Sequence, residues 1–452
     1  MPFIAKALDE MVHPSKLTNF GIRILRGLHQ VKRAFRFKEK KAFNANKDLL
    51  FERIKRILMA VELKIPDRVP ISLACSLAFP ALYSGYTIEE FLYDPRKNED
   101  AFFKFVRDFP GEAYFPSFFF QIGKLVEAAG LRFIKIPGRD LEPNVGYQFV
   151  ERELLEPNAY NEFGLNYFKE KILPELTDLA SEHPAKGVSM FKTMRYAFGY
   201  ISRILHNLDR AESLGVPMLL GSFTMQPFDM VSLLLRGLRG VSLDVRKYPE
   251  EVRRICDKLA RPLLNMALQS AKLFKRELHF PEAYNFEIFE HYKSKKENMR
   301  QGVFFVCERA FMLNPKQFEE IAFPSLNYVV RGLVDANLIP ILSFEQDVTH
   351  LLPIIRKLPG PGKVVFNCDL TDIVKAKEIL GDHICIMGNV PHSLLTVGSP
   401  KQIEKYCIEL IEKIGVDGGF ILGAALAIPD EAKPENVKAM IDAGMKYGVY
   451  RQ

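Results

Sequence analysis

Short apolar runs alternate with amphipathic, helix-like stretches along residues 382–447. The run Ile384–Met387 ends at Gly388-Asn389, and the run Phe420–Leu422 ends in Gly423-Ala424-Ala425. Strands that alternate with helices pair in parallel through right-handed crossovers. In a (β/α)8 barrel, the loops that follow the strands carry the chemistry. This alternation therefore predicts the closing units of a (β/α)8 barrel, with a candidate active site at the strand ends.

The same alternation extends back through most of the chain. With 452 residues and 48% hydrophobic content, the chain can bury a large core. Further strand candidates are Ile71–Cys75, Ala113–Phe120, Pro217–Ser222, Gly302–Cys307, Ile339–Ser343 and Lys363–Asn367. Helix-like stretches such as 315–336 and 400–414 separate most of them. Because eight such units fit the length better than an open sheet, we expect an α/β protein with a TIM barrel over residues 51–452.

Residues 132–195 do not fit one strand-helix unit. They contain the turn-forming pairs Pro137-Gly138 and Val145-Gly146, followed by Arg152-Glu153. Such pairs between polar and aromatic stretches predict a β-hairpin. We therefore expect an insertion that forms a lid near the barrel mouth.

Residues 1–50 differ in pattern from the rest of the chain, and we expect them to form a separate helical extension. From Leu17 to Phe35, apolar residues recur at three- and four-residue steps with Arg and Lys between them, which predicts a basic amphipathic helix. We expect this helix to pack across the barrel or against a second subunit of a homodimer. The alternative is contact of residues 17–41 with an anionic membrane surface or an acidic partner.

Charge and cysteine content exclude several classes of protein. The net charge of +7 is a mild excess for this length, and basic residues are mixed with acidic ones except near the N-terminus, so we expect no nucleic-acid binding. None of the six cysteines has the Cys-x-x-Cys spacing of a zinc ribbon or a thioredoxin-like site. The opening residues lack a signal-peptide pattern, and no apolar run is as long as a membrane span. We therefore expect a cytoplasmic protein with free thiols.

Carboxylates follow three of the expected strands at the point where each strand ends. They are Glu308, the pair Glu345 and Asp347, and Asp369. A carboxylate at the end of a buried strand is paired, bound to a metal, or shifted in pKa by burial. We therefore expect these four residues to be catalytic. The alternative is an ion pair from Arg309 to Glu345 or Asp369 that holds the barrel rim.

Polar side chains near these carboxylates are candidates for holding a cofactor. Arg309, Asn367 and Asn389 lie among them, and Gln226 and Asp229 follow the strand near residue 222. The alternative role for Asp229 is to cap a helix. The aromatic run Phe115–Phe120 has two interpretations, as core or as the wall of an apolar cavity suited to a flat macrocycle.

Motifs in the second half of the chain resemble the uroporphyrinogen decarboxylase superfamily. They are Gly388-Asn389-Val390 and the Pro-Glu-Asn-Val-Lys-Ala-Met run at residues 434–440. A short helix before Pro-Asp-Arg-Val-Pro at residues 66–70 is similar to the entry into the superfamily barrel. The resemblance runs from Pro66 to the C-terminus and is specific beyond residue 303. It implies a barrel whose mouth holds a tetrapyrrole-derived ring.

The superfamily has two main branches, uroporphyrinogen decarboxylases and cobalamin-dependent methyltransferases. The decarboxylases carry an Arg-Gln-Ala-Gly-Arg signature after their first strand, whereas residues 71–80 here contain no arginine. The long N-terminal extension and the Glu-x-Asp strand end look most like the methyltransferase branch. The resemblance thus implies a corrinoid-dependent methyltransferase or demethylase component, working with a separate corrinoid protein or free cobalamin and a small-molecule methyl donor or acceptor. The alternatives are a decarboxylase of a tetrapyrrole or another carboxylated substrate, and a non-catalytic barrel that acts as a binding or scaffold protein.

The resemblance also bears on zinc. Thiol-methylating members bind zinc through His-x-Cys at one strand end and a later Cys, and these positions correspond to Ser343, Glu345 and Leu426 here. A His that related long members keep at an earlier strand end corresponds to Val306. Because only Glu345 could still be a metal ligand, we do not expect a zinc site. The resemblance then implies an acceptor that needs no zinc, with Glu345 or Asp347 handling the proton.

Overall fold

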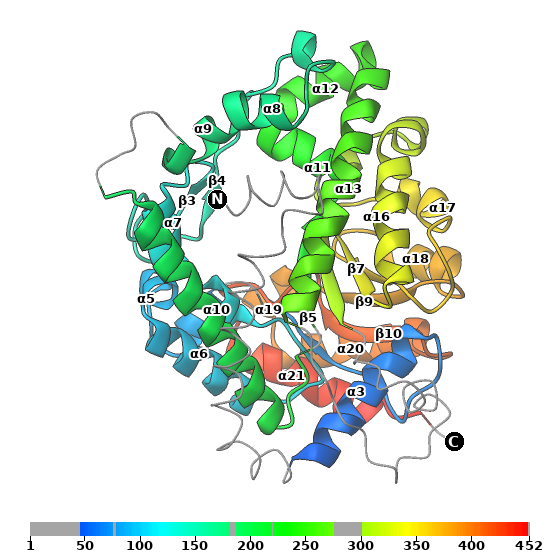
Figure 1. Ribbon diagram of the computed structural model, residues 1–452. Helices are drawn as coiled ribbons and strands as arrows, with labels where there is room; N and C mark the ends of the chain where they lie inside the picture. The colour runs from blue at the N-terminus through cyan, green and yellow to red at the C-terminus, as the bar shows by residue number, and fades with distance from the viewer. Residues whose placement is uncertain (1–45, 76–77, 181–186, 219, 275–300, 451–452) are drawn as a thin grey trace.

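A computed structural model describes most of the chain beyond the N-terminal extension (Figure 1). The described residues are 46–75, 78–180, 187–218, 220–274 and 301–450. The basic helix expected over Leu17–Phe35 lies outside them, as does the basic segment to residue 41. Helix α3 (Lys47–Val61) opens the described part of the chain.

The strands all run in parallel, apart from a small hairpin. The main sheet has the order β10-β9-β8-β7-β6-β5. Its strands are β5 (Leu220–Met225), β6 (Gly302–Val306), β7 (Ile339–Phe344), β8 (Val365–Cys368), β9 (Cys385–Val390) and β10 (Phe420–Ala424). Strand β1 (Ser72–Leu73) pairs in parallel with β2 (Ala113–Tyr114), and parallel bridges join Ile71 to Leu422 and Cys75 to Ile428. The strand order is therefore β2-β1-β10-β9-β8-β7-β6-β5, and each strand lies where the sequence predicts one.

The expected parallel α/β architecture is confirmed. Among the described residues no bridge joins β2 to β5, the two outer strands of this order. The ring of Phe115, directly after β2, nevertheless contacts that of Phe304 in β6, with a centroid distance of 5.5 Å. The residue that follows β2 therefore contacts the second strand from the other end of this order.

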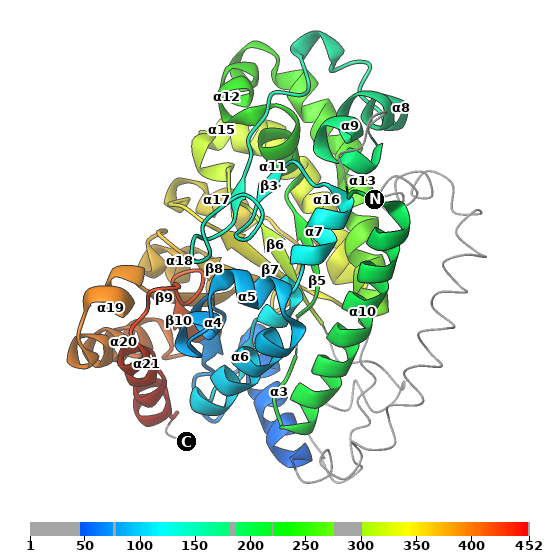
Figure 2. The ribbon, with the colours of Figure 1, turned by 90° about the vertical axis from the view of Figure 1, so that its left-hand side faces the viewer.

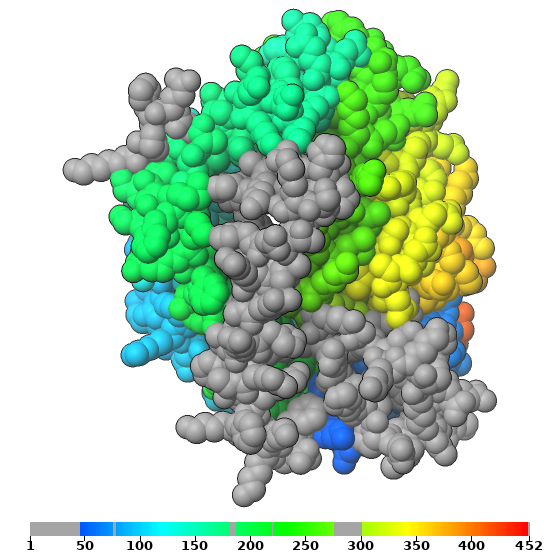
Figure 3. All heavy atoms as spheres, in the orientation of Figure 1, coloured from blue at the N-terminus to red at the C-terminus, as the bar shows by residue number. Residues whose placement is uncertain are grey.

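Helices cover the outer face of the sheet (Figures 1 and 2). The longer ones are α6 (Pro95–Asp108), α10 (Met190–Ser213), α12 (Gly237–Lys247), α13 (Pro249–Leu273), α16 (Phe323–Asp335), α20 (Pro400–Ile414) and α21 (Pro434–Tyr447). Phe305 and Leu342 point outward and are fully buried in one cluster with Val329 of α16. Burial of such a side chain stabilises the fold by about 1.5–3 kcal/mol. In the space-filling view, α10, α13 and α16 are among the described elements visible on one face (Figure 3).

Helix α3 covers the amino ends of the strands. Its buried residues Leu50, Phe51 and Ile54 pack in one cluster with Ile339 and Val365, the first residues of β7 and β8. The apolar filling of this end leaves the carboxyl ends of the strands as the side where polar groups gather.

The insertion contains the expected β-hairpin. Strand β3 (Ile134–Lys135) pairs antiparallel with β4 (Gln148–Phe149), after helix α7 (Gly123–Ala129). The strand expected over Ala113–Phe120 is shorter than predicted, because Pro116 has no N–H for a ladder and a 3₁₀ turn follows at Ser117–Phe120.

Candidate functional site at the carboxyl edge of the sheet

Three adjacent strands bring three carboxylates side by side. Strands β6, β7 and β8 are in register through the pairs Val306–Ser343 and Ser343–Asn367. Glu308, Glu345 and Asp369 each lie two residues further along, so they are at the same level and on the same face of the sheet. Neighbouring strands lie about 4.8 Å apart, which places Glu345 between two like charges. We call Glu308, Glu345 and Asp369 the carboxylate row.

The position of Glu345 changes its acidity. Burial raises its pKa from the usual 4.5 to about 7, and the neighbouring charges of Glu308 and Asp369 add to this, whereas Arg309 opposes it. Burial also raises the pKa of Asp369, against the opposing effect of His392. Within the described residues the Glu345 carboxyl group makes no hydrogen bond. It can therefore hold or release a proton near neutral pH.

Arg309 is the cation beside the carboxylate row. Its Nη2 lies 3.2 Å from Oε1 of Glu308, so its ion pair is with Glu308 and not with Glu345 or Asp369. Its Nε is buried and has no hydrogen-bond partner among the described residues. The edge thus keeps an excess of negative charge even with Arg309 present.

Asp229 fixes the loop that carries Glu308 and Arg309. It lies in helix α11 (Pro227–Met230), is fully buried, and accepts hydrogen bonds from the N–H groups of Glu308 (2.6 Å) and Arg309 (3.0 Å). Burial raises its pKa to about 8, against the lowering effect of these two hydrogen bonds. The helix cap that was the alternative for Asp229 is not observed, because the residue lies inside α11 and bonds to the loop after β6.

Asn367 lies below the carboxylate row on the same face. Its Nδ2 donates to Oγ of Ser343 (3.2 Å) and to the carbonyl of Leu426 (3.1 Å). The residue is 1% exposed, and its Oδ1 has no hydrogen-bond partner among the described residues. A buried acceptor left unpaired costs about 1–3 kcal/mol of free energy. A ligand that donates a hydrogen bond to this oxygen would recover that free energy.

The two other amides expected to bind a cofactor lie in different surroundings. Gln226 is fully buried, and neither atom of its amide has a partner among the described residues. Asn389 donates to the carbonyl of Asp369 (3.3 Å), and its Oδ1 lies 3.4 Å from the hydroxyl of Tyr406. Asn389 therefore braces the loop after β8.

Asp347 stabilises a turn after β7. Its Oδ1 accepts hydrogen bonds from the N–H (2.9 Å) and the hydroxyl (2.5 Å) of Thr349. The hydroxyl bond is the main reason that its pKa lies below the usual 3.8. Asp347 is also exposed, so the structure gives it different surroundings from Glu345, although the sequence places them two residues apart.

Aromatic rings form a continuous row from the sheet to the hairpin. The centroid distances along it are 6.2 Å for Phe223–Phe304, 5.5 Å for Phe304–Phe115, 5.8 Å for Phe115–Phe120, 6.4 Å for Phe120–Tyr147 and 5.6 Å for Tyr147–Phe149. All six side chains are half-buried or exposed, with Phe223 at 44% and Tyr147 at 39%. We call these six residues the aromatic row. Within Phe115–Phe120, Phe118 is core, whereas Phe115 and Phe120 belong to this row.

The aromatic row reaches the carboxylate row at Tyr147. Burial raises the pKa of Tyr147, and the charges of Glu345 and Glu308 raise it further. The sequence analysis did not identify Tyr147 or His392. The alternation of Tyr147 and Phe149 in a predicted hairpin strand was the signal that could have identified Tyr147.

Metal ligands are not grouped at this edge. In the part of the chain that the structure describes, no three His, Cys, Asp or Glu side chains are placed to hold a metal ion. Ser343 has neither the thiolate nor the imidazole of a usual zinc ligand. Leu426 has an apolar side chain, and its backbone carbonyl accepts a hydrogen bond from Asn367.

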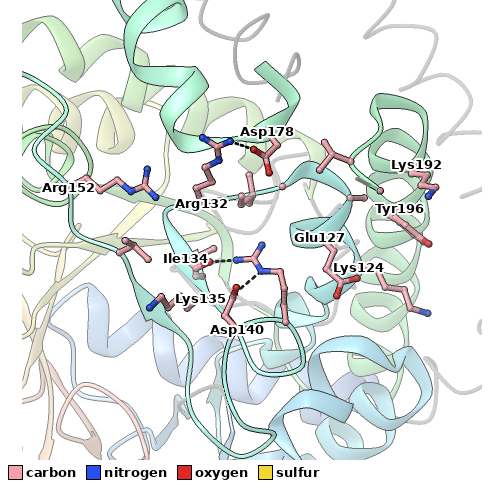
Figure 4. A pocket seen from close by; sticks show the side chains of 17 residues that line it. Lys124, Glu127, Arg132, Ile134, Lys135, Asp140, Arg152, Asp178, Lys192 and Tyr196 are labelled. Carbon is pink, nitrogen blue, oxygen red and sulfur yellow. Dashed lines mark hydrogen bonds and ion pairs between the residues drawn. The ribbon is translucent and has the colours of Figure 1, made fainter. Parts of the chain in front are cut away.

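A separate pocket lies beside the hairpin and is basic (Figure 4). It has a volume of about 670 Å³ and is walled by α7, the hairpin and the start of α10. Its charged lining residues are Lys124, Arg132, Lys135, Arg139, Arg152 and Lys192, with Glu127, Asp140 and Asp178. Six basic and three acidic side chains leave an excess of three positive charges. We call it the hairpin pocket.

The fold and the edge together define an α/β protein with a parallel sheet and a carboxylate-lined carboxyl edge. A solved methyltransferase from Methanosarcina mazei has a similar fold, with a TM-score of 0.57 and 16% identity, over 87% of this chain and 98% of that one. At this identity the likeness concerns the fold alone.

Sequence comparison finds relatives of the second half of the chain. The family model described as uroporphyrinogen decarboxylase (URO-D) matches residues 303–447. Curated relatives include the uroporphyrinogen decarboxylases of Pseudoalteromonas atlantica (26% identity over 140 residues) and Trichodesmium erythraeum (28% over 130 residues). These alignments cover 30% and 28% of this chain, and 38% and 36% of the relatives' length. Residues 303–447 are thus similar to the uroporphyrinogen decarboxylase family, and the match begins where the resemblance was expected to become specific.

One further finding concerns membranes. None of the helices within the described ranges is both long and apolar enough to cross a bilayer.

Proposed function

We propose that the protein is a corrinoid-dependent methyltransferase or demethylase component. The observation that carries this proposal is the charge of the carboxyl edge, where three carboxylates meet one arginine that is already paired with Glu308. Uroporphyrinogen bears many carboxylates, so this edge would repel it. Methyl transfer does not require the site to bind a substrate with many carboxylates. The fold is also similar to that of a methyltransferase.

The residues at the edge fit a flat ring with amide groups at its rim. The partly exposed rings of Phe115, Phe120 and Phe223 offer apolar area, and the unpaired Oδ1 of Asn367 offers an acceptor for an amide N–H. When bound, the corrinoid would supply or accept the methyl group. It would come as free cobalamin or on a separate corrinoid protein.

This chain would supply the proton chemistry and the positioning. Glu345, with its pKa of about 7, would give a proton to the atom that loses the methyl group or take one from the atom that gains it. Asp229 would act as a positioning residue, because it holds the backbone of Glu308 and Arg309. Burial of Glu345 among the strand ends would keep bulk water from competing for that proton.

A second candidate is a decarboxylase of a carboxylated substrate. The family model and the names of the curated relatives favour it. It requires cations that converge on the substrate, and Arg309 is the cation placed beside the carboxylate row.

The test is an anaerobic titration of the purified full chain with cob(I)alamin and with methylcobalamin, followed by the corrin absorption bands. Thiol and folate acceptors are included, and uroporphyrinogen turnover is measured in parallel. Spectral change with methyl transfer would support the proposal. Turnover of uroporphyrinogen without any corrin change would overturn it in favour of the decarboxylase.

A further inference from the structure

The aromatic row and the carboxylate row together have the composition of an organic-cation site. We propose that the small-molecule substrate at the carboxyl edge is a methylated organic cation, of the quaternary-ammonium class. This inference rests on the proposed methyl transfer for its reaction, but it concerns binding that can be measured separately.

The aromatic row supplies ring faces to such a cation. The face of an aromatic ring carries negative charge density and attracts a cation within about 6 Å, by about 0.5–2 kcal/mol. Phe223 and Phe304 are directly paired across β5 and β6, and Phe115 meets Phe304 edge-on. About half of the described phenylalanines are buried in the core, whereas these rings stay partly accessible. A ligand would explain why these stacked rings are left partly exposed.

The carboxylate row supplies the opposite charge. Glu308 comes two residues after the end of β6 and four residues after Phe304, so the carboxylates lie about 13 Å or less from the ring pair along the chain. Tyr147 links the two rows, since its ring stacks on that of Phe120 and the charges of Glu345 and Glu308 raise its pKa. A methylammonium group between them would touch ring faces on one side and carboxylates on the other.

Demethylation of such a cation can be written so that the electron pair, the methyl group and the proton are all accounted for. If a methyl group left a quaternary ammonium, the electron pair of the broken C–N bond would stay on nitrogen, and a reduced corrinoid, when bound, would supply the electron pair that accepts the methyl carbon. The product is a neutral amine, which can take the proton held by Glu345. A cationic substrate thus becomes a base beside a carboxyl group that can protonate it.

Choline and 3,3-dimethylbutan-1-ol are matched probes for this inference, because they have the same shape and differ in charge. Calorimetric titration of the full chain at neutral pH is expected to show choline binding about tenfold more tightly than the neutral alcohol. Tyr147→Leu should weaken both ligands, whereas Glu345→Gln should weaken choline several-fold and leave the alcohol unchanged. Equal affinities for the two probes, or no binding of choline, would overturn the inference.

A matched control separates this result from general effects of charge. Glu378 is an exposed carboxylate on α18 (Ile373–Leu380), and Glu378→Gln should leave choline binding unchanged. Loss of choline binding in this variant would contradict the site. Choline binding without any corrin reaction would support the cation site and overturn the methyl transfer. Corrin reaction without choline binding would do the reverse.

The hairpin pocket carries an independent inference. We infer that it binds a small, multiply charged anion of the diphosphate class. Its three carboxylates are already engaged: Asp178 with Arg132, Asp140 with Nε of Arg139 (2.7 Å), and Glu127 with the hydroxyl of Tyr93 (2.7 Å).

The lysines of the hairpin pocket remain available to a ligand. The side-chain ammonium groups of Lys124, Lys135 and Lys192 make no ion pair or hydrogen bond with any described residue, and these lysines come from α7, β3 and α10. Lys135 and Arg152 lie on one side of the pocket, and Lys124 and Lys192 on the other (Figure 4). An anion between them would be neutralised from both sides.

Inorganic pyrophosphate is the probe for this pocket. Calorimetry with the full chain should show binding that Lys135→Gln weakens about fivefold and that Lys401→Gln, a change of an exposed lysine on α20, does not affect. Equal affinity in wild type and Lys135→Gln would overturn the inference. Cosedimentation with phosphatidylglycerol vesicles, lost in Lys135→Gln, would assign the anion to a lipid headgroup instead of a free diphosphate.

Discussion

The hairpin β3–β4 contributes to two regions of opposite charge. At the carboxyl edge, Tyr147 and Phe149 extend a row of aromatic rings beside three carboxylates. In the hairpin pocket, Lys135 belongs to a lining with an excess of three positive charges. The two regions differ in burial as well as in sign, because Glu345 is half-buried between strand ends whereas the pocket lysines are exposed.

This difference shows how one short segment can serve two kinds of ligand. Charges at the end of buried strands are poorly hydrated, so their pKa values shift and they can take part in proton transfer. Exposed lysines stay hydrated and attract anions mainly through screened electrostatics. We therefore assign the chemistry to the edge and only binding to the pocket.

The largest effect is expected at Asp229. Asp229→Ala removes the acceptor for the N–H groups of Glu308 and Arg309, and leaving these donors unpaired should lower the free energy of unfolding by about 3 kcal/mol. Asp347→Ala is the comparison, because that carboxylate is exposed and should cost less than about 1 kcal/mol. Urea denaturation measures both. Equal losses in the two variants would contradict the positioning role of Asp229.

The next largest effect is expected from salt, which should weaken ligand binding in the hairpin pocket more than at the carboxyl edge. Raising the salt concentration from about 0.05 M to about 0.5 M should weaken pyrophosphate binding about tenfold and choline binding about twofold, because exposed charges are screened more than half-buried ones. Calorimetry at both concentrations gives the two ratios. A larger salt effect on choline than on pyrophosphate would reverse the comparison.

The smallest effect is a shift in pH dependence. Glu308→Gln removes a negative neighbour, which lowers the pKa of Glu345 from about 7 by about half a unit. If the reaction needs protonated Glu345, the rate is high below this pKa and falls as pH rises through it. The fall should therefore begin at lower pH in Glu308→Gln than in wild type or Glu378→Gln, as single-turnover rates across neutral pH would show. An unchanged or raised midpoint would argue against the proton role of Glu345.

The strands and the edge carboxylates could be predicted because they depend on local pattern. Apolar runs such as Ile339–Ser343 followed directly by Glu345 mark both a buried strand and its end. The hairpin near residues 134–149 followed from its turn pairs. These patterns could not tell that Glu345 is half-buried whereas Asp347 is exposed in a turn. The two residues lie only two positions apart in one loop.

Other features depend on contacts between distant parts of the chain. Asp229 bonds to residues 79 and 80 positions away, and no spacing rule predicts that. The aromatic row draws on β5, β6, the turn after β2 and the hairpin, so it exists only once the sheet has assembled. Phenylalanines are so frequent in this chain that composition alone cannot tell these rings from core residues.

The most direct test of the central account is a single-turnover methyl-transfer assay with cob(I)alamin or methylcobalamin, comparing wild type, Glu345→Gln and Glu378→Gln. The account predicts that Glu345→Gln loses about 100-fold in rate, while Glu378→Gln reacts as wild type does. Methyl transfer at the wild-type rate in Glu345→Gln would contradict it.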